Sequence, residues 1–240
     1  MITITDIHKH FDRQEVLHGI GASFDAGKTN LIIGRSGSGK TVLLRCIVGL
    51  LTPDQGEVLY DGRDIHHLTG DEATRLRQEM GMLFQGAALF DSMDVLHNVL
   101  FPLEMFSSKT YREQLQRARF CLERVGLTGA EGKMPSELSG GMQKRAAIAR
   151  AIALEPRYLF CDEPNSGLDP ISSRIIDGLI SDITHEYGIT TIVNTHDMGS
   201  VRGIGEQVLF IHEGRAEWTG TGDTIEQTES PHLREFLDHV

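Results

Sequence analysis

The sequence lacks a long hydrophobic run. Its best apolar stretch, Val42–Leu51, is interrupted by Arg45 and is shorter than the roughly 20 residues that a membrane-spanning helix needs. The N-terminal segment Met1–Asp6 has neither the positively charged head nor the apolar stretch of a secretory signal. We therefore expect that the chain neither crosses a bilayer nor leaves the cytoplasm by the secretory route.

Cysteines are few, and none of them belongs to a Cys-x-x-Cys pair. The chain has three, at Cys46, Cys121 and Cys161. An odd number without paired spacing argues against a disulfide framework and against a zinc site built from thiolates. We expect three reduced and buried thiols.

Positive charge is also scarce. Lysine and arginine total 23 against 34 aspartate and glutamate residues, which gives a formal net charge of −11. Nucleic-acid binding depends on basic side chains that neutralise phosphates, so we expect no nucleic-acid partner. Anionic lipid headgroups would also repel such a chain, so any membrane association should run through a protein partner.

The sequence does contain an alternation of short strands and helical stretches. This alternation predicts an α/β fold with a mainly parallel sheet covered on both faces, preceded by extended runs in residues 1–35 and continued at Gly56–Asp64. A hairpin turn is expected at Glu213-Gly214. The expected strands are Leu31–Ile33, Tyr158–Cys161 and Thr190–Asn194, and the expected helices are Thr41–Leu50, Met142–Leu154 and Ile171–Tyr187.

A helical lobe is expected to interrupt this pattern. Asp94–Phe106 and Thr110–Val125 have apolar residues at three- and four-residue spacing with charges between them, and Gly126 is a plausible helix stop. We therefore predict a single domain over residues 1–240, with a helical subdomain inserted at approximately residues 86–156.

An eight-residue glycine-rich segment lies between the first apolar strand and a helix. Its glycines let consecutive backbone N–H groups turn inward and form an anion-binding concavity at the positive end of the helix. The lysine is expected to reach the β- and γ-phosphates of a nucleotide, and the threonine hydroxyl to ligate Mg²⁺. A glycine-rich turn with an accidental lysine is the alternative, and the strand–loop–helix context disfavours it. The predicted phosphate loop comprises Gly34, Arg35, Ser36, Gly37, Ser38, Gly39, Lys40 and Thr41.

Two adjacent carboxylates follow the strand Tyr158–Cys161. Asp162 and Glu163 would lie at the carboxyl edge of the sheet, where ligands bind in open α/β folds. Neighbouring carboxylates repel each other, so the pair needs a cation or a division of roles. We expect Asp162 to hold Mg²⁺ and Glu163 to orient and deprotonate an attacking water. Taken alone, an apolar strand that ends in Asp-Glu would more simply predict a solvated turn. Because the pair follows a phosphate loop in the same chain, the functional interpretation is favoured.

A second anion cradle is expected where Ser139, Gly140 and Gly141 precede the alanine-rich helix. A serine and two glycines at a helix start offer free N–H groups and a hydroxyl. The simpler alternative is an N-cap with a flexible lead-in. Two such helix starts separated by a helical lobe, however, resemble the ATP-binding-cassette (ABC) family of ATPases over nearly the whole chain.

The resemblance implies a P-loop NTPase core of the ABC ATPase type, with an N-terminal antiparallel β portion and the inserted helical subdomain. It also implies further site residues. Gln85 resembles the Q-loop glutamine that touches Mg²⁺ and the catalytic water, and His196 resembles the switch histidine at the γ-phosphate. Ser166–Asp169 resembles the D-loop, which makes Asp169 a nucleotide-site residue. Phe11 falls where the family stacks an aromatic ring on adenine.

Three residues depart from the usual family pattern. Met142 replaces the signature glutamine, although Gln143 follows it, and Asn165 replaces a more usual threonine. Phe11 replaces a tyrosine and keeps the stacking face. None of these changes removes a metal ligand or the base. The resemblance therefore implies an active ATPase in which two head-to-tail copies enclose two ATP molecules, because the signature of one chain covers the nucleotide of the other.

Within the family, three segments look most like the ATPase subunit of Mla-type phospholipid transporters: Gln85–Glu104, Met134–Met142 and Glu163–Ile171. The resemblance implies a peripheral subunit on the cytoplasmic side of the bacterial inner membrane. It also implies a permease docked near the helical subdomain and a periplasmic lipid-binding subunit of the MCE class. Another ABC importer or exporter, a cassette acting in translation or DNA repair, and an assembly module without turnover are the alternatives.

Three groups of residues have simpler interpretations. The histidines lack carboxylate or cysteine partners at ligand spacing, so surface positions are expected rather than a metal site. Basic residues on the Met142–Leu154 helix are expected on its solvated face, and four apolar residues of the lobe are either its core or a permease contact. The histidines are His8, His10, His66 and His67, the basic residues are Lys144, Arg145 and Arg150, and the apolar residues are Ala87, Leu89, Phe90 and Met93.

Overall fold

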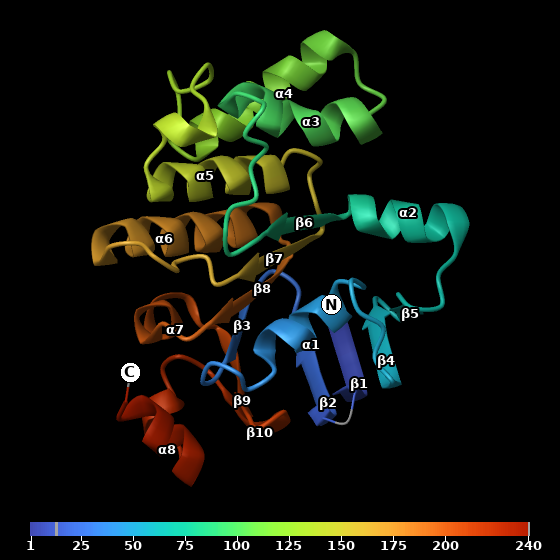
Figure 1. Cartoon of the computed structure of the whole chain (residues 1–240), viewed down its shortest axis with the longest axis vertical. Helices are drawn as coiled ribbons and strands as arrows, with labels where there is room; N and C mark the ends of the chain where they lie inside the picture. Colours follow the sequence, from blue (N-terminus) through green and yellow to red (C-terminus); the bar gives the residue numbers. More distant parts are fainter. Residues whose placement is uncertain (13, 240) are drawn as a thin grey trace.

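The computed structural model describes residues 1–12 and 14–239. Its larger sheet is mainly parallel (Figure 1), and only its last pair of strands in chain order forms an antiparallel hairpin. Across the sheet the order is β10 (Arg215–Gly220), β9 (Gln207–His212), β3 (Thr29–Ile33), β8 (Thr190–Thr195), β7 (Tyr158–Asp162) and β6 (Met80–Leu83). Every residue of β3, β7 and β8 is buried, as expected for strands covered on both faces.

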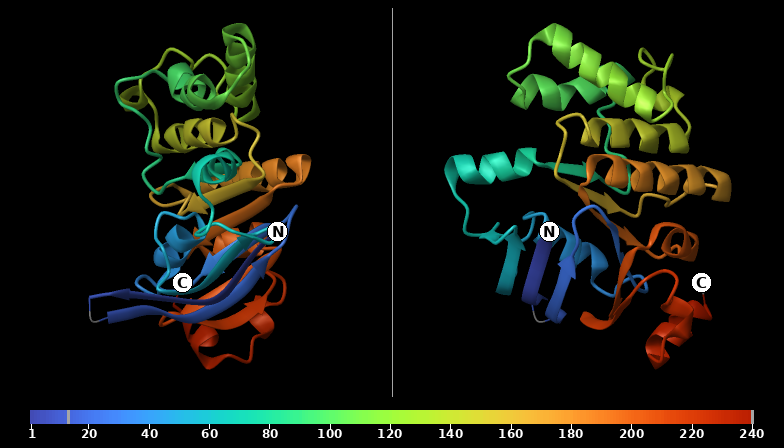
Figure 2. Two further views of the ribbon diagram at one scale, coloured as in Figure 1. Left: turned by 90° about the vertical axis from the view of Figure 1, so that its right-hand side faces the viewer. Right: turned by 180° about the vertical axis from the view of Figure 1, so that it is seen from behind.

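A smaller antiparallel sheet is built from the N-terminal part of the chain. Its order is β2 (Gln14–Phe24), β1 (Ile2–Phe11), β4 (Gln55–Tyr60) and β5 (Arg63–Asp64). Figure 2 shows the β1–β2 ribbon projecting from the body of the molecule. The expected combination of an antiparallel N-terminal portion with a parallel core is confirmed.

Alternating side chains of the parallel strands fill two hydrophobic cores. In β3, Ile32 packs with α1 (Lys40–Ile47) and the antiparallel sheet, whereas Leu31 and Ile33 face the opposite core. That second core includes α6 (Pro170–Tyr187) and α7 (Met198–Ile204). The period-two alternation of each strand therefore holds α1 on one face of the sheet and α6 on the other.

The helical lobe lies at one end of the molecule (Figure 1) and contains α3 (Val95–Phe106), α4 (Tyr111–Arg124) and α5 (Gly140–Ala151), with the short helix η1 (Pro135–Glu137) before α5. Side chains close the helix starts. The Asp94 carboxylate accepts the His97 N–H at 2.8 Å, and Thr110 and Glu113 form a capping box.

Four short helices follow no periodic pattern that the sequence analysis detected: α2 (Gly70–Gln78), α7, η2 (Ile225–Gln227) and α8 (Pro231–Leu237). In α2 only one residue is buried, so there is no apolar stripe to detect. The expectation of buried free thiols is confirmed, and burial raises the pKa of both Cys46 and Cys121 to about 11. In the part of the chain that the structure describes, no helix has both the length and the apolar character needed to cross a membrane.

Candidate active site

The loop between β3 and α1 has a backbone that only glycine tolerates at two positions. Gly34 and Gly39 have φ angles of 151° and 102°, in the region that favours glycine. A Cβ atom on Gly34 would collide with the carbonyl oxygen of Ile211, and one on Gly39 would lie 2.9 Å from Leu17 Cδ2. These glycines therefore let the loop curl closely around the N-terminal end of α1, where backbone N–H groups have no helical acceptor.

Lys40 lies at the centre of this loop. Its ammonium donates hydrogen bonds to the carbonyl oxygens of Gly34 at 2.8 Å and Arg35 at 3.1 Å, and the residue is only 6% exposed. Burial lowers the pKa of Lys40, while the negative charges of Glu163 and Asp162 act in the opposite direction. A buried ammonium held only by neutral carbonyls is well placed to receive an anionic phosphate.

A polar triangle joins the phosphate loop to the ends of β7 and β8. The Asn194 amide donates to Asp162 Oδ1 at 2.6 Å and to Thr41 Oγ1 at 3.2 Å, and Thr41 Oγ1 lies 3.4 Å from Asp162 Oδ1. Asn194 was not among the predicted site residues. Its only signal in the sequence is a single amide near the end of a strand whose other residues are threonine, isoleucine and valine. The triangle orients Asp162 and Thr41 toward each other.

Glu163 leaves the end of β7 with a φ angle of 49°, an uncommon backbone conformation for a residue with a side chain. Its N–H donates to the carbonyl oxygen of Asn194 at 2.8 Å, which holds this turn against β8. A carboxylate oxygen of Glu163 lies 2.9 Å from His196 Nδ1. The Glu163 side chain is 14% exposed and that of His196 is 60% exposed, so the carboxylate is largely covered while the imidazole is open to solvent.

Lys144 reaches the same region from the helical lobe. The residue is buried, and its ammonium donates hydrogen bonds to the carbonyl oxygens of Gln85 and of Glu163. Burial lowers the pKa of Lys144. The Gln85 amide in turn donates to Ser166 Oγ at 3.3 Å. Lys144 thereby connects α5 to two of the predicted site residues.

The expectation that the basic residues of α5 form a solvated face is wrong. Lys144 is buried as described above, Arg145 donates to the carbonyl oxygens at Val125 and Gly126, and Arg150 donates to those of Ala87 and Ala88. These carbonyls lie at turns, where the backbone has no regular partner, so long basic side chains reach inward to satisfy them.

A cleft of about 770 Å³ gathers most of the predicted residues. It also takes in residues that the sequence analysis did not assign: Val16 from β2, and Glu235, Phe236 and His239 from the C-terminal segment. Glu235 lies 2.9 Å from the Arg35 guanidinium in an ion pair. The predicted residues lining the cleft are Arg35, Ser36, Gly37, Gly39, Lys40, Thr41, Gln85, Glu163 and His196.

Of the other predicted residues, Gly34, Ser38 and Asp162 belong to the loop and strand that border the cleft, whereas Ser139, Gly140, Gly141 and Asp169 lie outside it. Ser139 caps α5, where its hydroxyl accepts the Met142 N–H at 3.3 Å, and Gly140 and Gly141 follow it. Asp169 caps α6, and hydrogen bonds from Ser172 lower its pKa.

Two further residues that bear on the expected family pattern, Phe11 and Gln143, also lie outside the cleft. Phe11 is exposed at the end of β1 and does not line the cleft. The Gln143 amide is engaged inside the lobe, where it donates to the carbonyl oxygen of Pro135 at 3.0 Å. Gln143 therefore does not stand in for the glutamine that Met142 replaces.

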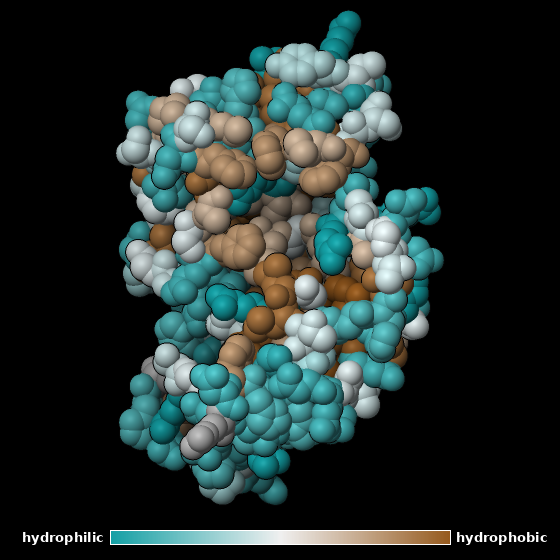
Figure 3. All heavy atoms as spheres, turned by 45° about the vertical axis from the view of Figure 1, so that its right-hand side comes forward, coloured by the Kyte–Doolittle hydropathy of each residue, from teal (hydrophilic) through white to brown (hydrophobic). Residues whose placement is uncertain are grey.

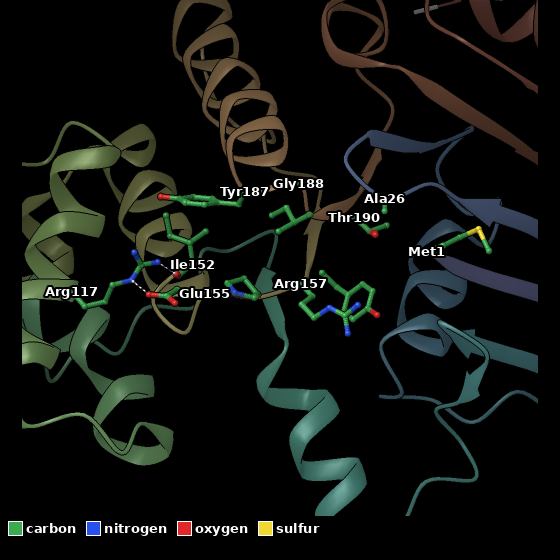
Figure 4. Close-up of a pocket in the computed structure, with 12 residues that line it drawn as sticks. Met1, Ala26, Arg117, Ile152, Glu155, Arg157, Tyr187, Gly188 and Thr190 are labelled. Carbon is green, nitrogen blue, oxygen red and sulfur yellow. Dashed lines mark hydrogen bonds and ion pairs between the residues drawn. The ribbon is translucent and has the colours of Figure 1, made fainter.

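A second cavity, of about 440 Å³, lies at the opposite end of the parallel strands (Figure 4). Arg117, Ile152 and Glu155 lie on one side of it and Met1 on the other. The Arg117 guanidinium donates to the carbonyl oxygens of Ile152 and Ala153 at the end of α5, so its charge is already engaged. None of the predicted site residues lines this cavity, and it is not a competing candidate for the active site.

Two curated relatives align with nearly the whole chain. The methionine import ATP-binding protein MetN of Clostridium acetobutylicum is 38% identical over 237 residues, which cover 99% of this chain and 74% of the relative. The intermembrane phospholipid transport system ATP-binding protein MlaF of Haemophilus influenzae is 43% identical over 211 residues, covering 88% and 80%. The second relative supports the expected resemblance to Mla-type ATPases.

Solved structures share the fold. The dimeric structure of MJ0796, a bacterial ABC transporter cassette, superposes with a TM-score of 0.84 at 31% identity and covers 92% of this chain and 98% of that one. The same cassette has been solved in a post-hydrolysis state with ADP and phosphate, with a TM-score of 0.83. The family model described as ABC transporter matches residues 17–166. The chain therefore belongs to the ABC transporter family, as an ATP-binding cassette subunit that hydrolyses ATP.

Proposed function

We propose that this ATPase works as a homodimer on Mg²⁺-bound ATP and drives a membrane permease that transports phospholipid. The observation that carries the proposal is the division of the predicted site between two surfaces of one chain. The phosphate loop, Glu163 and His196 line one cleft, whereas Ser139 lies on the lobe outside that cleft. A second copy can supply the missing half.

The residues around Thr41 fit a magnesium ion. Thr41 offers a hydroxyl, Asp162 a carboxylate and Gln85 an amide oxygen, and hard oxygen donors are the ligands that Mg²⁺ prefers. The Oδ1 atom of Asn194 is buried beside them without a hydrogen-bond partner. When bound, the ion supplies charge neutralisation on the phosphate oxygens.

The chain's own residues would then carry the reaction as follows. Lys40 exchanges its bonds to loop carbonyls for bonds to phosphate oxygens. Glu163, whose turn is pinned to β8, accepts a proton from the attacking water. His196 keeps the Glu163 carboxylate oriented through its Nδ1, and its exposed ring is free to contact the γ-phosphate.

The exposed N-terminus of α5 supports the proposed dimer. Ser139 and Gly140 are exposed, and the helix start carries unsatisfied N–H groups and a partial positive charge. An isologous two-fold arrangement places this end over the nucleotide in the partner's cleft and generates two equivalent sites. The dimeric cassette structure of MJ0796 supports this arrangement. Phe11 is proposed to stack on the adenine ring, and Asp169 to contact the nucleotide.

An apolar groove on the lobe supports permease docking. It has a volume of about 310 Å³ and runs between β6 and the lobe, with Phe84, Phe90 and Phe101 among its lining residues. Figure 3 shows apolar side chains gathered around a hollow at the middle of this face. Phe84 and Phe90 are 39% and 40% exposed, whereas Ala87 is buried. Ala87 therefore belongs to the core of the lobe, whereas the exposed rings of Phe84 and Phe90 are the proposed contact with the permease.

Phospholipid is the proposed substrate because three segments of the chain resemble Mla-type ATPases and the MlaF relative is 43% identical. The same resemblance supports a location on the cytoplasmic side of the inner membrane and an MCE-type subunit in the complex. The MetN relative supports methionine as the competing substrate. A role in translation or DNA repair is disfavoured by the acidic charge balance.

The test begins with purification of the tagged full chain from its native membranes. We expect a permease and phospholipid to copurify with the wild type and with Tyr111→Asp, which alters an exposed aromatic residue elsewhere on the lobe. Phe90→Asp should lose the permease while still binding ATP. The recovered complex, placed in vesicles, should transfer fluorescent phospholipid when ATP is added. ATP-driven methionine uptake instead would overturn the lipid assignment, and recovery with ribosomes or DNA would overturn the transporter assignment.

A further inference from the structure

Two histidines and a glutamate meet at the C-terminal end of the fold. His212 ends β9, Glu217 lies in β10, and His232 lies in the first turn of α8. His232 Nδ1 lies 2.8 Å and 2.9 Å from the two carboxylate oxygens of Glu217. The rings of His212 and His232 stack with centroids 4.1 Å apart and planes only 7° from parallel. Three elements of the C-terminal segment thus converge on one carboxylate.

The arrangement gives three metal-ligating atoms at close range. One ring nitrogen from each histidine and one oxygen of Glu217 all lie within 4.8 Å of one another. Among residues 1–12 and 14–239, no other set of three histidine, cysteine, aspartate or glutamate side chains meets this condition. Ser230 Oγ donates to Glu217 Oε1 at 2.6 Å, which orients the carboxylate from behind. Such an outer hydrogen bond is typical of protein metal sites.

We propose that His212, Glu217 and His232 form a binding site for a zinc-class divalent metal ion. Two imidazole nitrogens and one carboxylate oxygen suit Zn²⁺, whereas Mg²⁺ prefers a shell made only of oxygen. In the bond to Glu217 the neutral His232 ring carries its proton on Nδ1, because a carboxylate can only accept. On metal binding that proton moves to Nε2 through solvent, and the freed Nδ1 lone pair goes to the ion. The bond to Glu217 is thereby replaced by coordination of both groups. His232 is exposed, so water completes the coordination sphere.

The site would fasten α8 to the β9–β10 hairpin. At present α8 is held there by the contact between Phe236 and Phe210, whose ring centroids lie 5.5 Å apart, and by the bonds around Glu217. The next part of α8 reaches the nucleotide cleft, where Glu235 pairs with Arg35. A metal bridge would therefore order a helix that forms one wall of the cleft. This inference does not depend on which substrate is transported.

The test uses the full chain without nucleotide, titrated with Zn²⁺ by calorimetry in buffer that contains excess Mg²⁺. We expect the wild type to bind one more Zn²⁺ ion than His232→Ala or Glu217→Gln, or to bind it at least tenfold more tightly. His67→Ala is the matched control, because His67 is also exposed and also pairs with a carboxylate, that of Asp64. This variant should bind Zn²⁺ like the wild type.

Two further measurements make the result independent of any folding defect in the variants. X-ray absorption of the zinc-loaded wild type should show two imidazole ligands, and amide exchange within residues 231–237 should slow when Zn²⁺ is added. Equal affinity in the wild type, His232→Ala and Glu217→Gln would overturn the proposal. So would an absorption spectrum without imidazole ligands, or unchanged exchange in α8.

Discussion

Replacing Glu163 with glutamine isolates the proton-accepting role of the carboxylate. Glutamine has the same shape, and its amide oxygen can still accept a hydrogen bond at the 2.9 Å distance from His196 Nδ1. The backbone N–H bond to Asn194 is unaffected by the substitution. The change therefore removes a base and a negative charge while leaving the phosphate loop and its Lys40 contacts in place.

The expected loss is set by the contribution of a positioned general base. That contribution is about 10²- to 10⁴-fold in rate, or about 3 to 5 kcal/mol of activation free energy at 1.36 kcal/mol per tenfold. ATP affinity should stay close to that of the wild type, because Lys40 and the loop N–H groups supply the binding contacts. The bound ATP is then hydrolysed slowly, so an ATP-bound dimer should accumulate.

Phosphate release under single-turnover conditions, nucleotide titration and sedimentation with ATP measure the three quantities. Glu213→Gln is a suitable control, since Glu213 is an exposed glutamate with a similar φ angle of 45° in the β9–β10 turn. It should hydrolyse ATP like the wild type. If Glu163→Gln retains hydrolysis within threefold of the wild type, Glu163 is not the base and the role assigned to its turn is wrong.

Three further substitutions probe other parts of the molecule. Lys144→Gln removes a charged hydrogen-bond donor from two carbonyl oxygens, and each such bond is worth about 1.5 to 3 kcal/mol. We therefore expect turnover to fall at least tenfold while ATP affinity is retained. A steady-state rate near that of the wild type would contradict this. Ser139→Arg should preserve ATP binding but abolish dimer-dependent hydrolysis, and unaffected hydrolysis would contradict the sharing of sites between chains. Burial raises the pKa of Asp177 above its ordinary value of 3.8, so the folded state opposes ionisation of this carboxyl. As the pH rises from 3.8 through the raised pKa, the free energy of unfolding of the wild type should therefore fall relative to that of Asp177→Asn. Urea unfolding of both proteins across this interval checks the sign, and a constant difference would refute it.

The conformation of the predicted phosphate loop could be anticipated because its eight residues are contiguous and its glycines meet local backbone requirements. Gly34 and Gly39 have backbone angles that exclude other residues, and Lys40 begins the helix. The location of Asp162 and Glu163 was predictable for a related reason. Ligands bind at the carboxyl edge of a parallel sheet, and these two residues follow an apolar strand at that edge. Local rules and one topological rule account for this half of the cleft.

Asn194, Lys144 and Glu235 were missed because each acquires its role only through tertiary contact. Asn194 is a polar residue in a strand that could equally have faced solvent, and its partners lie 32 and 153 residues away. Lys144 belongs to a helix whose composition predicts a solvated face. Glu235 lies on a seven-residue helix that periodicity could not detect. The spacing of residues along the chain does not predict these tertiary contacts.

The position of Lys144 has a mechanical consequence for the ATPase. It lies five residues after Ser139 in the same helix, about 7.5 Å along its axis. A regular α-helix is stiff over this distance, so a force applied at the Ser139 end moves the Lys144 ammonium with it. That ammonium bonds to the carbonyl oxygens of Gln85 and Glu163. A shift of α5 must therefore either carry both residues along or break two charge-assisted hydrogen bonds in a buried site. If Ser139 contacts a partner's nucleotide, as proposed, this helix ties that contact to the alignment of Glu163, the proposed base, in the same chain.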